Sequence, residues 1–474
     1  MLYRSMEKGK RRNALAALGL SLLLFWPCGC AAPRENVSSA VEDVDLLPSV
    51  SAEATASLIG PAVSAPGRLS AVSRRRLEIS DVFRSPGTTA AVPGQTPNKE
   101  GEETEEFRGV WLSYIELNAM LKGKNAEEAA AALDAVMGNA ASYGLNAVVF
   151  HVRAMSDAYY QSSLFPPASA AKALLEGGFD PLSYAVKSAH AHGLQLHAWV
   201  NPYRIGANKE NAGCDAFFSA PSGSTTYYYY NPASEEAQSL ILRGVEEIVT
   251  NYEVDGVQFD DYFYPNNPEV IPPDSPAAFE KEDYAAYVDA GGALGIGDWR
   301  RAQVDVLVAG VYQRVHAREG CVFGISPDYN ADKDYSSLYA DVKGWAAAAG
   351  YLDYICPQIY FGFENSSAPF DRAVAAWTDY PRHPSVRLYV GLGLYKTGVS
   401  PDAYAGKGKE EWAGHSDIMK RSVELLRANN AVTGMVFYSY SSFDAATRSA
   451  ASGQTYSEEV GRQEVENLLY LLQN

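Results

Sequence analysis

The sequence predicts a (β/α)8 TIM-type barrel, preceded by a lipoprotein signal peptide and a disordered tether. Two observations predict the barrel: eight apolar, strand-like segments alternate with helix-like stretches, and polar side chains recur where these strands end. A third observation disfavours a doubly wound sheet, because no Gly-rich dinucleotide-binding turn follows the first strand. We therefore expect a barrel with enlarged loops over residues 105–474.

The N-terminal stretch has the pattern of a targeting segment. A basic region, residues 1–13, precedes an apolar region, residues 14–27, which is short for a membrane span. Gly29 then precedes Cys30, as at the cleavage site of a bacterial lipoprotein. We expect residues 1–29 to be a signal peptide and Cys30 to be lipidated, with a plain secretory signal as the alternative. Either reading predicts an extracytoplasmic protein, and lipidation predicts one anchored to a bacterial membrane.

The segment between this signal and the barrel is expected to be a tether. Residues 30–104 are rich in Ala, Ser, Val, Pro and Gly and have no sustained periodicity. Such a composition does not bury enough apolar surface to fold. We expect a flexible segment that holds the folded part away from the membrane.

Charge and cysteine usage exclude several classes of function. The chain has 474 residues and a formal net charge of −18, from 39 basic and 57 acidic residues. No basic block follows the N-terminus, which argues against nucleic acid as a partner. Beyond the N-terminal segment the cysteines are Cys214, Cys321 and Cys356, whose wide spacing fits no zinc site. We expect neither a metal nor a cofactor.

The expected strands and helices follow in order along the chain. Helix signals include Gly144 and Gly193 at helix ends, an Asp-Pro start at residue 180, and Ser–Glu starts at residues 234 and 457. The strands are predicted at residues 107–114, 145–153, 194–204, 254–263, 321–330, 351–361, 386–395 and 432–440.

Alternation along each strand predicts which side chains face the barrel axis. In the fourth strand Gln258 and Asp260 are expected inside, and Val257 and Phe259 are expected to face the helices. Because polar residues gather at the C-terminal strand ends, the sequence predicts a polar, aromatic-rimmed pocket at the barrel mouth. The other side chains expected inside are His151, Arg153, His197, Trp199, Asn201, Ser326, Asp328, Gln358, Tyr360, Tyr438 and Tyr440.

Two adjacent acids, Asp260 and Asp261, follow the fourth strand and stand among aromatic residues. Buried carboxylates are costly unless paired, so this arrangement indicates chemistry, and carboxyl pairs at a barrel mouth are typical of glycoside hydrolysis. Neighbouring acids suit a scheme in which one orients the acetamido group of the substrate and the next is the general acid. We assign these roles to Asp260 and Asp261 respectively, and the reverse assignment stays open.

A conventional carboxyl pair is the alternative scheme, and Asp328 and Glu364 are the reserve carboxylates for it. A loop cap or a cation site is the structural alternative for the adjacent acids. Further candidates for substrate binding have structural alternatives in buried ion pairs, turns and core packing. These candidates are His151, Arg153, Trp199, Asn201, Tyr203, Tyr264, Gln358, Tyr360 and Tyr438.

Six segments in register resemble the glycosyl-hydrolase-like 10 domain of bacterial lipoproteins. They are "FRGVWLS", "HAWVNPYR", "VDGVQFDDYFYP", "FGISP", "YICPQIY" and "GMVFYSY", and the resemblance runs over about residues 105–445. It implies a (β/α)8 glycosidase acting on envelope glycan, in particular peptidoglycan glycan strands without stem peptides. It carries the acid pair over to Asp260 and Asp261, and pocket residues over to Asn201, Tyr203 and Arg204.

The expected function is therefore a membrane-anchored, extracytoplasmic glycoside hydrolase that acts on an N-acetylated amino-sugar polysaccharide. Two alternatives stay open. One is a non-catalytic glycan-binding lipoprotein that keeps the barrel as a recognition surface. The other is a hydrolase of another exopolysaccharide or of α-linked glycan.

Overall fold

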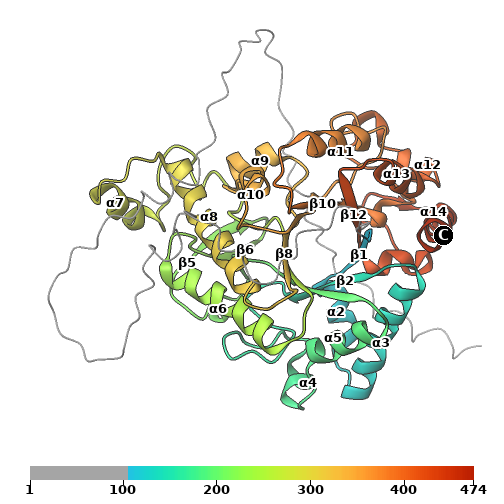
Figure 1. Ribbon diagram of the computed structural model, residues 1–474, viewed down its shortest axis with the longest axis horizontal. Helices are drawn as coiled ribbons and strands as arrows, with labels where there is room; N and C mark the ends of the chain where they lie inside the picture. The colour runs from blue at the N-terminus through green and yellow to red at the C-terminus, as the bar shows by residue number, and fades with distance from the viewer. Residues whose placement is uncertain (1–104) are drawn as a thin grey trace, which may run out of the picture.

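A computed structural model describes residues 105–474, so the predicted signal peptide, the tether and Cys30 lie outside the described residues. Eight parallel strands close a barrel in the order β1-β12-β10-β9-β8-β7-β3-β2 (Figure 1). All eight predicted strands are confirmed as barrel strands. They are β1 (Phe107–Leu112), β2 (Ala147–Arg153), β3 (Gln195–Val200), β7 (Gly256–Phe259), β8 (Val322–Ile325), β9 (Tyr354–Ile355), β10 (Arg387–Leu392) and β12 (Val432–Tyr438).

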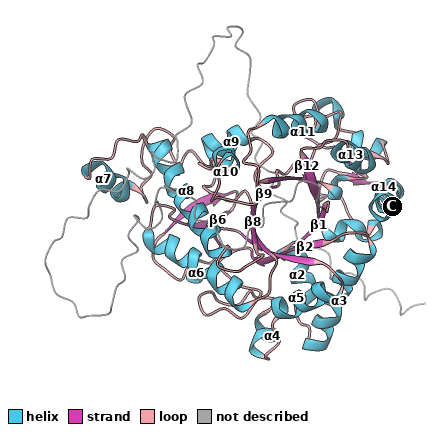
Figure 2. Cartoon of the chain, viewed as in Figure 1, coloured by secondary structure: helices cyan, strands magenta, loops and turns pink. Residues whose placement is uncertain are grey.

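Helices surround this barrel, as expected for β/α alternation (Figure 2). The Asp-Pro start is confirmed, because the Asp180 side chain accepts a hydrogen bond from the Ser183 backbone N–H. Ser234 and Ser457 cap their helices in the same way. The helices are α2 (Tyr114–Leu121), α3 (Ala126–Ser142), α4 (Lys172–Glu176), α5 (Pro181–Ala191), α6 (Glu235–Asn251), α7 (Lys281–Asp289), α8 (Ile296–Val315), α9 (Ala331–Ser337), α10 (Val342–Ala347), α11 (Phe370–Asp379), α12 (Glu411–Gly414), α13 (Ile418–Arg427) and α14 (Glu458–Gln473).

The loops at the barrel mouth carry small elements of their own. Between β3 and β7, an antiparallel sheet forms in the order β4-β6-β5 from β4 (Arg204–Gly206), β5 (Phe217–Ser222) and β6 (Thr225–Tyr230). The run of four tyrosines at residues 227–230 lies in β6, and so it belongs to a β-hairpin insertion. A second small sheet pairs β11 (Val399–Ser400) with β13 (Thr455–Tyr456). Single 3-10 turns are η2 (Lys209–Asn211), η3 (Leu394–Lys396), η4 (Gly406–Gly408), η5 (Tyr440–Phe443) and η6 (Ala445–Thr447).

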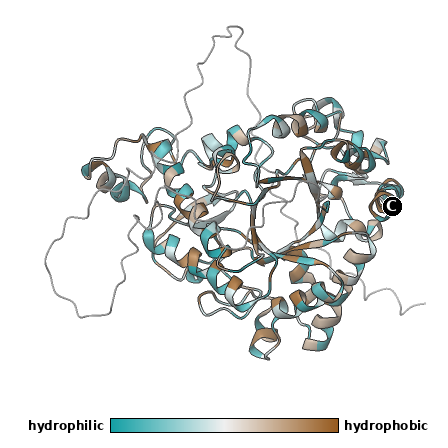
Figure 3. Cartoon of the chain, viewed as in Figure 1, coloured by the Kyte–Doolittle hydropathy of each residue, from teal (hydrophilic) through white to brown (hydrophobic). Residues whose placement is uncertain are grey.

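Apolar side chains lie on both faces of the barrel strands, and Figure 3 shows these strands as predominantly hydrophobic. Outward residues such as Val257 and Phe259 pack with the helices in one core. Inward residues such as Phe107, Trp111 and Tyr354 form a second cluster inside the barrel. The predicted alternation is thus confirmed for β7. Within residues 105–474, no helix combines the length and apolar character needed to cross a bilayer.

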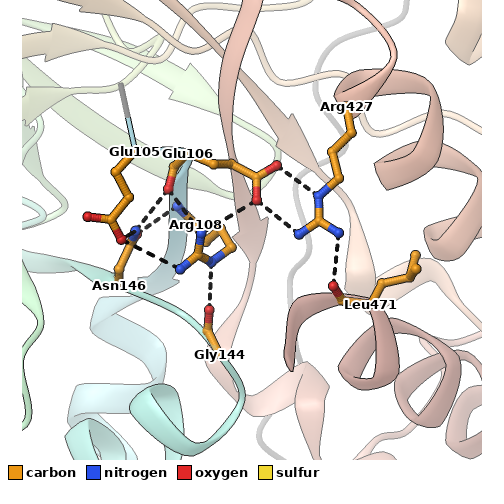
Figure 4. Close-up of polar contacts among 7 residues, drawn as sticks. All are labelled: Glu105, Glu106, Arg108, Gly144, Asn146, Arg427 and Leu471. Atoms are coloured by element: carbon orange, nitrogen blue, oxygen red, sulfur yellow. Dashed lines mark hydrogen bonds and ion pairs between the residues drawn. The ribbon is translucent and has the colours of Figure 1, made fainter. Parts of the chain in front are cut away.

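The start of β1 is held by charged groups from distant parts of the chain (Figure 4). The Arg427 guanidinium on α13 donates to both oxygens of Glu106, at 3.0 and 2.9 Å, and to the backbone oxygen of Leu471 on α14 at 2.9 Å. Arg108 Nε donates to the backbone oxygen of Gly144 at 2.7 Å. These bonds join the first strand, the end of α3 and the last two helices.

Gly144, the predicted end of a helix, allows this junction to close. Its φ is +80°, and a Cβ at this position would lie 2.4 Å from the backbone oxygen of Leu472. Gly123 has a similar φ of +73°, with nothing within 4 Å of a Cβ. Conformation alone therefore requires glycine at residue 123, whereas conformation and space both require it at residue 144.

We predict that Gly144→Ala destabilises the fold more than Gly123→Ala. The left-handed backbone costs about 1–2 kcal/mol for alanine in both variants, and the overlap with α14 adds about 1–3 kcal/mol for Gly144→Ala. Urea unfolding of the full chain, with Gly123→Ala as the control, measures the difference. Equal losses in the two variants would contradict the packing of α14 against Gly144.

Candidate active site

The acid pair lies just beyond the C-terminal end of β7. The strand ends at Phe259, so Asp260 and Asp261 both belong to the turn that follows it. This position frees Asp261 from strict alternation and lets both side chains reach the same region. Asp260 is only 3% exposed, whereas Asp261 is partly exposed.

Asp260 is held by two hydrogen bonds. Its Oδ2 accepts from Trp199 Nε1 at 2.8 Å, and its Oδ1 accepts from the backbone N–H of Tyr262 at 3.2 Å. Burial, and then the charge of Asp261, raise the pKa of Asp260 to about 7, although these two bonds and Arg204 oppose the rise. Near neutral pH this carboxyl group therefore exchanges its proton readily.

Asp261 has a different set of neighbours. Its Oδ1 accepts from Gln358 Nε2 at 3.1 Å. Burial, and then the charge of Asp328, raise the pKa of Asp261 to about 6. Asp328 is itself buried, and its oxygens accept from the Asn330 backbone N–H at 2.9 Å and from Lys333. Because the acids raise one another's pKa, the site holds a proton and a negative charge together near neutral pH.

A further carboxyl group in this cluster, Asp334 on α9, was not predicted from the sequence. It is fully buried, and within residues 105–474 neither carboxylate oxygen has a hydrogen-bond partner. Burial first, and then the charges of Asp328 and Asp261, raise its pKa well above the usual value. The sequence around Asp334 is that of an ordinary polar first turn of a helix. Nothing in the sequence therefore distinguishes Asp334 from an exposed helix-start acid.

His151 lies at the mouth as predicted. Its ring stacks on Trp199 with centroids 3.5 Å apart at 9° and meets Tyr114 edge-on at 5.7 Å. Burial, and then the nearby Arg204, lower its pKa well below the usual value, so the imidazole is neutral. Neither ring nitrogen has a hydrogen-bond partner among the described residues.

Arg204 also lies at the mouth, between two aromatic rings. Its guanidinium carbon is 4.9 Å from the centre of the Tyr227 ring and 5.0 Å from that of Tyr262. Tyr227 comes from the inserted strand β6, and Tyr262 follows the acid pair and is exposed. The insertion and the turn after β7 thus hold one cation beside the acids.

Other predicted aromatic residues gather on the β9 and β12 side of the barrel. The Tyr360 and Tyr438 rings stack with centroids 5.8 Å apart, and both contact Trp111. Both tyrosines pack against the inward cluster of the barrel, as alternation predicted.

Glu116 is a second residue that the sequence did not single out. Its carboxylate accepts from the backbone and hydroxyl of Ser113 at 2.7 and 2.8 Å. It also accepts from the Ser439 hydroxyl at 2.9 Å and the Ser441 backbone at 2.6 Å. Glu116 therefore joins the ends of β1 and β12 next to Tyr438.

The prediction that Arg153 faces the barrel axis is wrong. The pairing of β2 with β3 shifts between His151 and Arg153, and this irregularity pairs Arg153 with the outward-facing Val200. Its guanidinium carbon lies 4.4 Å from the centre of the Phe165 ring and packs near Gly244 on α6. Arg153 is thus buried behind the barrel wall, away from the acids.

Two other predicted substrate-binding residues, Tyr203 and Tyr264, are packed inside the protein. Tyr203 is 1% exposed and meets Phe263 edge-on at 6.5 Å. Tyr264 is 1% exposed, and its hydroxyl donates to Glu280 at 3.4 Å. The long loop after β7 packs against both rings, which leaves neither accessible to substrate. Tyr262, by contrast, is 40% exposed.

Two further predictions need correction. Glu364 is exposed and its carboxylate lies 3.7 Å from His415 at the surface, so it forms no part of the acid cluster. Tyr440 faces α3, because its hydroxyl accepts from Asn139 Nδ2 at 2.9 Å. Asn201 Oδ1 accepts from the Arg204 backbone N–H at 3.1 Å and so caps the turn after β3, and its role in substrate binding stays a prediction.

Comparison with known proteins identifies relatives of this chain. The family Glycosyl hydrolase-like 10 matches residues 106–405. The glycosyl hydrolase YngK of Bacillus subtilis (strain 168) is 30% identical over 369 residues, 71% of this chain and 69% of the relative. The glycosyl hydrolase DigH of Escherichia coli (strain K12) is 28% identical over 400 residues, 74% of this chain and 86% of the relative. The glycoside hydrolase domain of PgaB (BpsB) from Bordetella bronchiseptica aligns with a TM-score of 0.47 and 13% identity, covering 71% of this chain and 94% of its own.

The barrel, the family match and the two relatives YngK and DigH together define a glycoside hydrolase. In particular, the chain belongs to the Glycosyl hydrolase-like 10 family, which confirms the resemblance carried by the sequence motifs.

We predict that Asp260→Asn stabilises the fold in a pH-dependent way. The raised pKa of Asp260 means that the folded chain holds this proton more tightly than the unfolded chain. The stability that the proton contributes is complete below about pH 4 and is lost as the pH rises to about 7. Relative to the unaltered protein, Asp260→Asn therefore gains stability over this range, by at most about 4 kcal/mol at pH 8.

Urea unfolding of the full chain at pH 5 and pH 8 measures this gain. Asp274→Asn, which removes an exposed carboxylate in the loop after β7, is the control and is expected to change little at either pH. A gain that does not grow with pH would mean that the folded chain does not bury the charge of Asp260.

Proposed function

We propose that this glycoside hydrolase cleaves an N-acetylated amino-sugar polysaccharide, in particular peptide-free peptidoglycan glycan strands, and that Asp260 and Asp261 carry the reaction. The observation that supports this most is the pair itself: two carboxyl groups in one turn at the barrel mouth, with pKa values raised to about 7 and about 6. Glycoside cleavage requires one protonated and one ionised group near the bond. Two coupled carboxyl groups with these pKa values share a proton near neutral pH, so the pair can supply both forms, and the role of each acid is assigned from its contacts rather than from its pKa.

The two acids suit different roles. Both oxygens of Asp260 are held by hydrogen bonds deep in the site, which suits a group that orients the substrate. Asp260 then accepts the N–H of the 2-acetamido group and directs the acetamido oxygen at the anomeric carbon. Asp261 is more exposed and keeps one oxygen clear of Gln358, which suits a general acid that must reach the glycosidic oxygen.

The proposed reaction has two steps. Asp261 gives its proton to the departing glycosidic oxygen while the acetamido oxygen bonds to the anomeric carbon, and a cyclic oxazolinium ion forms. Asp261, now ionised, takes a proton from water while the water oxygen bonds to the anomeric carbon. The bond between the anomeric carbon and the acetamido oxygen breaks, which restores the acetamido group and gives net retention of configuration. Asp328 supports this cycle by raising the pKa of Asp261. Its oxygens are engaged with Asn330 and Lys333, which disfavours it as a separate nucleophile.

We expect the full-length protein to release short disaccharide-repeat oligomers from amidase-stripped peptidoglycan, as followed by mass spectrometry. Asp260→Asn and Asp261→Asn are each expected to lower the rate by a hundredfold or more, because each removes one of the two roles (about 10²–10⁴ for a lost acid–base group). Asp274→Asn is the control and is expected to keep the activity.

A substrate with a good leaving group separates the two roles. An oligosaccharide nitrophenyl glycoside needs little protonation, so we expect it to restore activity to Asp261→Asn and not to Asp260→Asn. Restoration in Asp260→Asn alone would reverse the assignment. Intact glycan after incubation with the unaltered protein, on this polymer and on poly-N-acetylglucosamine, would overturn the proposed substrate class.

We also propose that Cys30 anchors the protein to a bacterial membrane through lipid, outside the cytoplasm. The support is the order of the N-terminal residues: a basic region, an apolar region, Gly29 and then Cys30. Cells fed a labelled fatty acid are expected to label the protein, and Cys30→Ser is expected to abolish the label, with Cys214→Ser as the control. A label that persists in Cys30→Ser would exclude this anchor.

A further inference from the structure

Arg204 is a cation at the barrel mouth that lacks an anionic partner. Among the described residues its Nε has no hydrogen-bond partner, and no carboxylate lies within ion-pair distance of its guanidinium. The ionisable groups that act on it most strongly are four tyrosines. Two of these, Tyr227 and Tyr262, hold the guanidinium between their rings.

Three other largely buried cations have anionic partners: Arg300 donates to Glu280, Lys333 to Asp328, and Lys396 to Asp402 at 2.8 Å. Arg153 also lacks an anionic partner among the described residues, but it packs on Phe165 behind the barrel wall, out of reach of the mouth. A buried or half-buried charge without a partner is costly, and at the barrel mouth a ligand can supply the opposite charge. Arg204 is partly exposed, so a ligand at the barrel mouth can reach it.

The surroundings of Arg204 indicate what kind of ligand fits. A guanidinium held between rings keeps its plane fixed and presents a pair of N–H donors, which matches the two oxygens of a carboxylate. His151 beside it is neutral, so it adds no second positive charge. The fork of donors fits a carboxylate or a phosphate, but the single positive charge of Arg204 balances the one charge of a carboxylate and not the two charges of a phosphate.

The acid cluster gives a second reason for a cation at this place. Asp260, Asp261 and Asp328 make the pocket negative, and the chain as a whole carries −18. A negatively charged sugar would be repelled from such a pocket unless a cation met its charge directly. The Arg204 guanidinium packs on Tyr262, the residue that follows Asp261, so it lies beside the turn that carries the acids.

We propose that Arg204, held by Tyr227 and Tyr262, is a subsite for a carboxylate borne by the sugar chain, and that this carboxylate is the 3-O-lactyl group of an N-acetylmuramoyl residue. The inference rests on the proposed function, since it names the group by which that glycan is recognised. A stem peptide converts this carboxylate to an amide and removes the charge that Arg204 meets. The subsite therefore favours strands from which the peptides have been removed.

The test compares binding of two tetrasaccharides that differ only in charge. One is a two-repeat fragment of peptide-free glycan with free lactyl carboxylates, and the other is the same fragment with these groups reduced to alcohols. Calorimetry with the full-length Asp261→Asn protein in detergent measures both affinities. We expect the acid to bind about tenfold to a hundredfold more tightly, as for a charge-assisted pair of hydrogen bonds.

Three substitutions on this background separate recognition from folding. Arg204→Gln is expected to bring the ratio of the two affinities close to one. Arg204→Lys keeps the charge without the planar pair of donors and is expected to give an intermediate ratio. Arg462→Gln is the control, because Arg462 lies on the exposed face of α14 and bonds to Glu466, and it is expected to leave the ratio unchanged.

Two results would overturn the subsite. The first is equal affinity for the two fragments in the protein with Arg204 intact. The second is a ratio that survives Arg204→Gln. The test measures binding rather than cleavage, so it separates the subsite from the proposed hydrolysis. If the protein binds the carboxylate-bearing fragment more tightly but the unaltered protein cleaves no glycan, the subsite stands and the proposed hydrolysis is refuted.

Discussion

The pairing of polar side chains inside the closed barrel is the constraint on which the site depends. Gln258 accepts from Trp111 Nε1 at 2.6 Å and donates to the Tyr354 hydroxyl at 3.2 Å, deep among the inward side chains. Unpaired polar groups there would be costly, so these bonds fix the direction of β7 two residues before Asp260. Trp199 then holds Asp260 itself. The acids are therefore directed by the neighbouring strands as well as by their own turn.

Periodicity predicted the barrel and much of the mouth, because alternation is a property of any regular strand. It put Gln258 inside β7 and Trp199 inside β3, where both are found. It failed for Arg153, because the shift in pairing after His151 changes the face without changing the apolar pattern of the strand. Periodicity did not identify Asp334. Its burial depends on the tertiary packing of α9 near the acids, which residue spacing does not predict.

The acid cluster is arranged for chemistry at the expense of stability. Burial first, and then the charge of Asp328, raise the pKa of Asp261 and that of Asp334, and Lys333 is the nearby cation that opposes both shifts. One ammonium group does not neutralise four neighbouring carboxyl groups, so some of them must keep their protons near neutral pH. A group that holds a proton under these conditions is what a general acid requires. The packed strands and helices outside the mouth must provide the stability that this cluster lacks.

The functional groups at the barrel mouth are held by two parts of the fold, the barrel strands and the β4-β6-β5 insertion, and each part can change without the other. The acids follow a barrel strand, and their geometry depends on pairs that cross the barrel. Arg204 instead depends on Tyr227 from the β4-β6-β5 insertion, which lies outside the barrel sheet. An insertion of this kind is altered without disturbing the strand register, because its hydrogen bonds are made largely within itself. The position of the catalytic acids thus depends on the barrel strands. The position of Arg204, which we propose binds the carboxylate of the sugar, depends on the insertion. A chain that kept the acids and lost the tyrosines of β6 would keep the chemistry and lose the hold on Arg204.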